Sequence, residues 1–186
     1  ETQVMRDAVI TRLQTIYARY NLAPGDANTT SGIKFYRSDV HSPDQIPTPY
    51  QTIYVGGSPP DNYLGVADYV DPRNSTTTGT AIVFATNIAQ RGMTGGFSGA
   101  MNSALAVGNA MGNVAAHVLG YMIGLRNTSD ATDVMQGTNI YTIGDPTVFR
   151  TLKTNATVTV TEQVGSLAPI GIQDAIQLLD ETIGVP

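Results

Sequence analysis

The residues with the clearest chemical potential lie between His117 and Asn127, a segment that holds one of only two histidines in the chain. Residues at i and i+4 of a helix project from the same face, so His117 and Tyr121 are expected side by side. A catalytic zinc ion needs three protein ligands and an open position. In this segment only His117 supplies an imidazole. Tyr121 is a phenol with an ordinary pKa of about 10, and Asn127 is a neutral amide, so both are poor zinc ligands. Val118 cannot act as a general base, so the usual zinc mechanism is not expected.

Two carboxylates follow this segment, at Asp130 and Asp133. Either could replace a missing imidazole or hold calcium, although acidic residues in a Thr- and Ser-rich turn are more often capping groups. His41 could offer a second imidazole, but it lies in the proline-rich stretch 38–49, which is typical of a surface loop. His117 is therefore interpreted as a hydrogen-bonded core histidine, with metal ligation as the alternative.

Two other segments could carry chemistry. Gly96–Ala100 approaches the G-x-S-x-G nucleophile elbow of serine hydrolases, but Ala100 stands where the second glycine is required. A loop before a long helix is the favoured interpretation. Asp71–Thr78 is predicted to be a turn and polar loop, with a surface cation or recognition site as the alternative.

Hydrophobic periodicity predicts the elements that position these residues. Residues 2–20 have the spacing of an amphipathic helix, and residues 99–125 are apolar nearly all round, which predicts a helix buried through the domain. Short β-branched and aromatic runs bounded by turn residues predict strands at Ile33–Tyr36, Thr52–Val55, Leu64–Tyr69, Thr80–Ala85 and Thr157–Val160. A last amphipathic helix is predicted over Ile172–Ile183. The order of elements indicates an α/β or α+β domain.

The surroundings of His117 resemble a known family. Ala115-Ala116-His117-x-Leu119-Gly120-x-x-x-Gly124-Leu125 is similar to the active-site helix of matrixin-like secreted bacterial metalloproteases, which are metzincins. The segment matches the first histidine and the glycine of H-E-x-x-H-x-x-G-x-x-H, and Met135 lies at the distance of the Met-turn. Val118, Tyr121 and Asn127 stand in place of the glutamate and the other two histidines. The first helix and the strands at 53–57, 64–68 and 81–84 are also similar, so the resemblance covers about residues 3–137.

The resemblance implies one metzincin-like domain over residues 1–186. Its upper part, residues 1–127, would hold a mixed twisted sheet of about four to five strands and two long helices. A smaller irregular part, residues 128–186, would hold the Met-turn and a final helix. Tyr121, Val118 and Met135 are expected to fill the space left by the metal, so no cofactor is expected.

The resemblance also implies where a ligand would bind. Metzincins hold an extended substrate antiparallel to an edge strand beside the active-site helix. The corresponding residues here are Leu64, Gly65, Val66 and Ala67. Main-chain pairing needs no metal, so an extended peptide or protein could still bind there. A proline at Val66 is expected to remove one edge donor.

Composition excludes several partners. Ten Lys+Arg against fifteen Asp+Glu give a net charge of −5 without a basic cluster, which argues against nucleic acid and anionic lipid. The long uncharged stretch from Gly92 to Leu125 is interrupted by Asn, Ser and Gly, so membrane insertion is not expected. The absence of cysteine excludes disulfides and thiolate chemistry. The surplus of Thr, Asn and Gly favours an extracellular or cell-envelope location.

The leading hypothesis is a non-catalytic, metalloprotease-like binding or structural module. One alternative is an active hydrolase, either a zinc metallopeptidase with a rebuilt ligand set around His117 or an unrelated serine-type enzyme. The other alternative is a purely structural domain.

Overall fold

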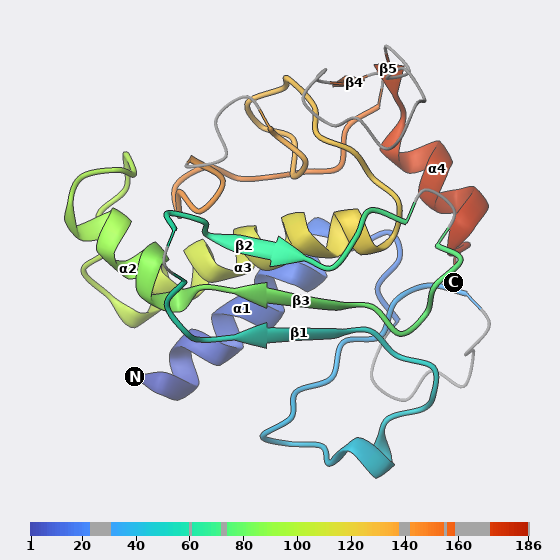
Figure 1. Ribbon diagram of the computed structural model, residues 1–186, viewed down its shortest axis with the longest axis horizontal. Coiled ribbons are helices and arrows are strands. Elements are labelled where there is room, and N and C mark those ends of the chain that lie inside the picture. The colour runs from blue at the N-terminus through green and yellow to red at the C-terminus, as the bar shows by residue number, and fades with distance from the viewer. Residues whose placement is uncertain are drawn as a thin grey trace.

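The structure, a computed structural model, describes residues 1–22, 31–59, 61–71, 74–137, 142–154, 156–158 and 172–185. In these residues the chain forms a mixed α/β fold with four α-helices and a small mixed sheet (Figure 1). The elements are α1 (Thr2–Ile16), η1 (Pro43–Gln45), β1 (Thr52–Val55), β2 (Gly65–Ala67), β3 (Thr80–Val83), α2 (Ala85–Met93), α3 (Ala104–Met122), β4 (Ala156–Thr157), β5 (Ile172–Gln173) and α4 (Ala175–Thr182).

The main sheet has three strands in the order β1-β3-β2. β1 runs parallel to β3, with Thr52 opposite Thr80, and β2 runs antiparallel to β3, with Val66 opposite Ile82. β4 and β5 form a separate antiparallel pair. The expectation of four to five strands in one sheet is therefore wrong for the described residues. β2 lies at the edge, on the side of the sheet nearest α3 in Figure 1.

Several of the predicted elements differ from the structure in their bounds or their type. Ile33 forms only an isolated bridge with Asn21, because its backbone groups bond to Tyr20 and Leu22 in the turn after α1. The predicted strand at Ile33–Tyr36 is thus absent. The strand predicted over Thr80–Ala85 ends at Val83, and α2, which the sequence did not predict, begins at Ala85. Ile172–Gln173 is a strand, because Asp174 caps the last helix by accepting from the Gln177 N–H at 3.0 Å.

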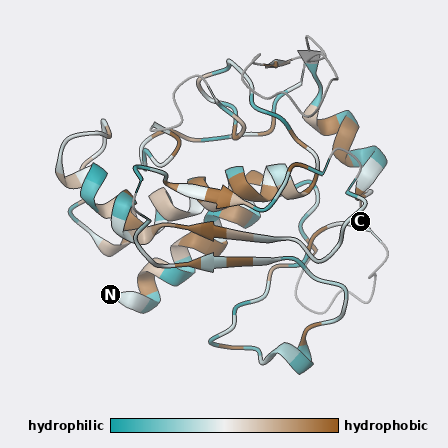
Figure 2. Ribbon diagram, in the orientation of Figure 1, coloured by the Kyte–Doolittle hydropathy of each residue, from teal (hydrophilic) through white to brown (hydrophobic). Residues whose placement is uncertain are grey.

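The long apolar helix is confirmed as α3, with narrower bounds than predicted. The Ser103 hydroxyl accepts from the Ala106 N–H and caps its start. Gly124 has φ 98°, and the Leu125 N–H donates to the Gly120 carbonyl at 2.8 Å, which ends the helix in a Schellman-type turn. Every residue from Ala110 to Gly120 is buried. Figure 2 shows the same helix and the sheet strands as predominantly hydrophobic.

α3 contacts both α1 and the sheet, and the two helices lie on the same face of the sheet, behind it in Figure 1. Glycines permit both contacts. A Cβ at Gly108 would lie 2.6 Å from the Met5 carbonyl oxygen, and a Cβ at Gly65 of β2 would lie 2.8 Å from Val114 Cγ1. These separations are shorter than van der Waals contact, so no larger residue fits without moving an element.

None of the helices in the described part of the chain has both the length and the apolar character needed to cross a bilayer.

Gly108→Ala should lower the free energy of unfolding by about 1–3 kcal/mol, because the added methyl group collides with α1 backbone. The loss should appear although alanine is about 1 kcal/mol better than glycine in a helix. Chemical denaturation measures it. Asn109→Ala, on the same helix, is the control and should leave the stability unchanged or raise it by up to about 0.7 kcal/mol, because alanine has the higher helix propensity. Equal effects of the two substitutions would show that α1 and α3 are not in close contact.

Candidate functional site

Three residues with chemical potential meet at the C-terminal end of α3. The His117 and Tyr121 rings lie edge to face, with centroids 4.8 Å apart and an interplanar angle of 80°. The Tyr121 hydroxyl donates to Asn127 Oδ1 at 2.8 Å. Asn127 reaches this position because the chain turns at Gly124. The structure therefore brings together the three positions that the resemblance gives to zinc ligands.

His117 is held as a neutral imidazole. Its Nδ1 lies 2.8 Å from the Val134 carbonyl oxygen, which can only accept, so Nδ1 carries the proton and Nε2 has the lone pair. Burial lowers the pKa of His117 to about 4, more than the Val134 hydrogen bond raises it, and the nearby Arg150 charge lowers it further. The imidazole thus has the tautomer of an Nε2 metal ligand, but it stands in a core environment.

Met135 lies beneath α3, at the level of Gly120. It is fully buried, and a Cβ at Gly120 would lie 2.2 Å from its Sδ. The turn that carries it is ordered by Asp133, whose carboxylate accepts from the Met135 N–H at 3.1 Å and from the Thr128 hydroxyl at 2.7 Å. Burial raises the pKa of Asp133. Its carboxylate therefore serves the turn that places Met135 under the helix.

Asp130 also serves this turn. It accepts from the Thr132 N–H at 2.8 Å and from the Thr132 hydroxyl at 2.9 Å. These hydrogen bonds lower the pKa of Asp130. Both carboxylates thus have the contacts of capping groups.

Arg150 is a structural residue that the sequence analysis missed. It is 1% exposed, and its guanidinium donates to the carbonyls of Ala131, at 2.7 Å, and Thr142, at 2.8 Å. A third bond, to the Asp133 carbonyl, is longer at 3.4 Å. Arg150 therefore joins segments that have no regular secondary structure. A single arginine in an irregular stretch gives no periodic signal by which to detect it.

Val118 does not face the His117–Tyr121 pair. It is 1% exposed, and its Cγ1 would lie 3.1 Å from a Cβ at Gly65. Val118 therefore packs between α3 and β2. Val118 and Met135 are buried and Tyr121 is half-buried, but the expectation that Val118 fills space beside His117 is wrong, because it packs against β2.

The donor set does not fit a catalytic zinc ion. One imidazole, one hydrogen-bonded phenol and one neutral amide do not supply the three nitrogen, sulfur or carboxylate ligands that zinc takes. His41 packs edge-on against Tyr36 in its own loop, with centroids 5.3 Å apart. Within the described residues, no three His, Cys, Asp or Glu side chains are grouped as metal ligands would be. No step through a metal can be derived from these residues.

The other two candidate segments are used structurally. The Ser98 hydroxyl donates to the Asp145 carboxylate and not to an imidazole, so the arrangement of a Ser-His pair is not formed there. Asp71 is 5% exposed and accepts from the Thr76 N–H and the Ser75 hydroxyl. Its own N–H donates to the Tyr121 carbonyl at 3.0 Å, which joins Asp71 to the end of α3, while residues 72 and 73 of the predicted loop lie outside the described residues.

The edge of β2 presents main-chain groups of alternate residues. The Leu64 carbonyl accepts from the Phe84 N–H at 2.8 Å, and the Asp68 N–H donates to the Thr80 carbonyl at 3.0 Å. In an antiparallel ladder, the main-chain N–H and C=O groups of successive residues point to opposite sides of the strand. Gly65 and Ala67 therefore direct their N–H and C=O away from β3. Val66 faces β3. The expectation that Val66 supplies an edge donor is therefore wrong, since a proline there would break the internal ladder.

Comparison with protein-family models, with curated proteins and with solved structures finds no match to this chain.

We expect His117 to titrate near pH 4, not near its ordinary value of about 6.5. Because the pKa of His117 is lower in the folded than in the unfolded state, folding favours its neutral form, and its contribution to the free energy of unfolding is fully present above pH 6.5. That free energy falls by roughly 3 kcal/mol as the pH drops from about 6.5 to about 4. NMR of the His41→Gln variant, in which His117 is the single imidazole, measures the pKa directly. Titration near 6.5 would contradict the buried geometry.

Proposed function

We propose that this chain is a non-catalytic, metalloprotease-like domain that binds an extended peptide along the open edge of β2. The observation that carries the proposal is the pair of outward-facing residues Gly65 and Ala67 on an antiparallel edge strand packed against α3. Among the described residues no strand pairs with the other side of β2. Such an edge binds a peptide through main-chain hydrogen bonds.

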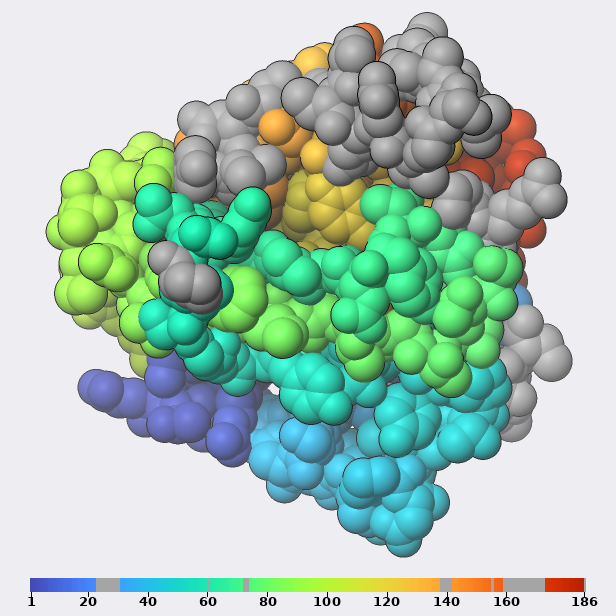
Figure 3. All heavy atoms as spheres, in the orientation of Figure 1, coloured from blue at the N-terminus to red at the C-terminus, as the bar shows by residue number. Residues whose placement is uncertain are grey.

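The exposed face of the sheet adds an apolar surface beside this edge. Tyr54, Ile82 and Val66 are neighbours across the three strands, and they are 59%, 39% and 44% exposed. The space-filling view shows residues of β1 to β3 on the front of the molecule (Figure 3). Alternate side chains of a bound peptide would contact Val66, because alternate residues of a strand project to opposite faces.

The hydrogen-bonding of the α3 site supports a binding role over hydrolysis. Tyr121 and Asn127 bond to each other, and Val118 is packed against β2, so no carboxylate stands beside His117 at the position where a metalloprotease has its general base. Peptide pairing needs only backbone groups, and it is compatible with these side chains. The Thr-, Asn- and Gly-rich composition favours an extracellular or envelope setting for such a module.

The metzincin relationship is tested by restoring ligands. The double variant Tyr121→His/Asn127→His should bind zinc with micromolar or tighter affinity, because its three imidazoles would converge at the end of α3. Val118 is kept, since a glutamate there would bury a charge against β2. Wild type should bind no stoichiometric zinc. Calorimetry measures both affinities.

The control for that experiment is the triple variant that also carries His117→Gln, which should lose the zinc affinity of the double variant. A folded double variant that binds no zinc would count against the metzincin relationship.

Ala67→Pro should weaken peptide binding at least about ten-fold, because it removes an N–H from the open edge while leaving the bonds to β3. The probe is an array of random octapeptides coupled through their N-termini. Val66→Thr is the control, since it keeps every main-chain group, and it should retain binding. Circular dichroism verifies the fold of both. Absence of binding by wild type would favour a purely structural domain, and equal binding by Ala67→Pro would place the ligand elsewhere.

A further inference from the structure

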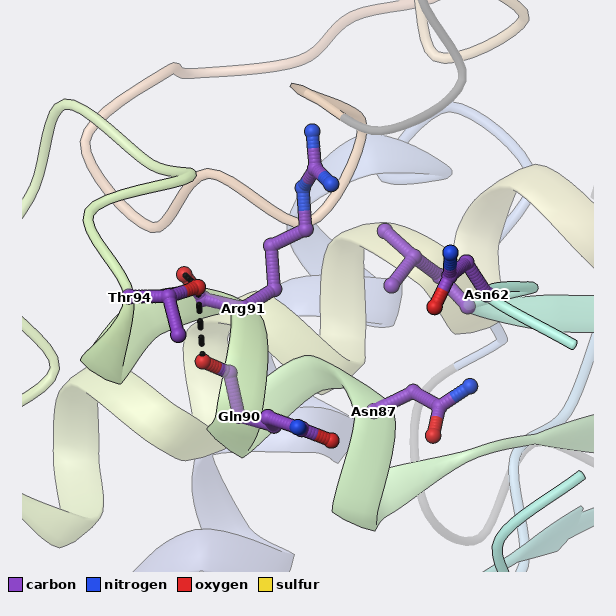
Figure 4. Close-up of a pocket in the computed structure, with 6 residues that line it drawn as sticks. Asn62, Asn87, Gln90, Arg91 and Thr94 are labelled. Carbon is purple, nitrogen blue, oxygen red and sulfur yellow. Dashed lines mark hydrogen bonds between the residues drawn. The ribbon is translucent and has the colours of Figure 1, made fainter.

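A small polar cavity lies between α2 and the start of β2. Its volume is about 120 Å³, and it is lined by Asn62, Leu64, Asn87, Gln90, Arg91 and Thr94. Figure 4 shows the Arg91 side chain extending away from α2, with Asn62 across from it. The lining includes a cationic group, several amides and a hydroxyl, and no carboxylate. Asn87 Nδ2 and the Thr94 hydroxyl donate to backbone carbonyls, so the Arg91 charge and the Asn62 and Gln90 amides are the groups that suit a small anionic ligand.

The walls of this cavity are held in place. Asn87 Nδ2 donates to the carbonyls of Asp61, at 2.7 Å, and Tyr63, at 2.9 Å, which fixes the segment before β2 against α2. Gly96 leaves room for the Arg91 stem, since a Cβ there would lie 2.6 Å from Arg91 Cγ. The Gly96 N–H donates to the Arg91 carbonyl at 2.9 Å. The cavity is therefore pre-organised, which reduces the entropy lost on binding.

The direction of β2 relates this cavity to the peptide. β2 runs from Gly65 to Ala67, and Leu64, which lines the cavity, directly precedes it. A peptide paired antiparallel to β2 runs the opposite way, so its C-terminal end arrives at the start of β2. Resting on the proposed function, we infer that the cavity binds the free C-terminal carboxylate of the peptide, with Arg91 as its counter-charge.

The test compares the octapeptide array in two forms, with a free C-terminal carboxylate and as the C-terminal amide. Wild type should bind acid peptides at least about ten-fold more tightly than the amides, because a charge-assisted hydrogen bond is lost in the amide. Arg91→Gln should remove this preference while leaving amide binding unchanged. Arg91→Lys should retain part of it.

Arg6→Gln is the matched control, since it removes the same charge from α1, where Arg6 pairs with Asp39 on the surface. It should keep the full acid preference. Equal wild-type affinity for acid and amide, with binding still sensitive to Ala67→Pro, would overturn this inference and leave the proposed function standing. No binding of either form would overturn both. Amides that end in Glu and bind as tightly as the acids would assign the cavity to a side-chain carboxylate instead.

Discussion

The burial of α3 on all sides is the constraint on which the rest of the structure depends. Gly108 brings α1 close, Gly65 brings β2 close, and Gly120 leaves room for Met135. Because each contact is limited by backbone or by a buried side chain, the positions of the neighbouring elements are fixed by α3. The edge strand and the His117–Tyr121 pair are therefore held in a constant relationship. Replacing one of these glycines should therefore move both the edge strand and the His117–Tyr121 pair.

A helix buried in this way must satisfy its polar residues internally. Asn113 donates to the Asp145 carbonyl at 2.8 Å, and His117 bonds to the Val134 carbonyl. Both bonds reach the irregular segment after α3, which has few backbone ladders of its own. Since an unpaired buried polar group costs about 1–3 kcal/mol, these bonds help to fix that segment as well as the helix. Arg150 donates to two carbonyls of the same segment, those of Ala131 and Thr142.

Much of the fold could be predicted from sequence where a pattern depends only on local chemistry. α1, β1, β3 and α3 follow from hydrophobic periodicity, and His117 and Tyr121 share a face because any helix places i and i+4 together. The strand at Ile33–Tyr36 was wrongly predicted, because propensity does not say whether a partner strand is near. Arg150 was missed for the related reason that its carbonyl partners are brought close only by tertiary structure.

Sequence alone also does not predict which residues of β2 direct their main-chain groups to the open edge. Alternation along Leu64–Asp68 shows which residues share a face, but it does not show which main-chain groups face outward. That depends on pairing with β3, where the Asp68 N–H bonds to Thr80 and so turns Gly65 and Ala67 to the open side. The open groups belong to the backbone, whereas metal ligation would use side chains at the C-terminal end of α3. The two would involve different atoms, so pairing of a peptide with this edge would not depend on a metal site.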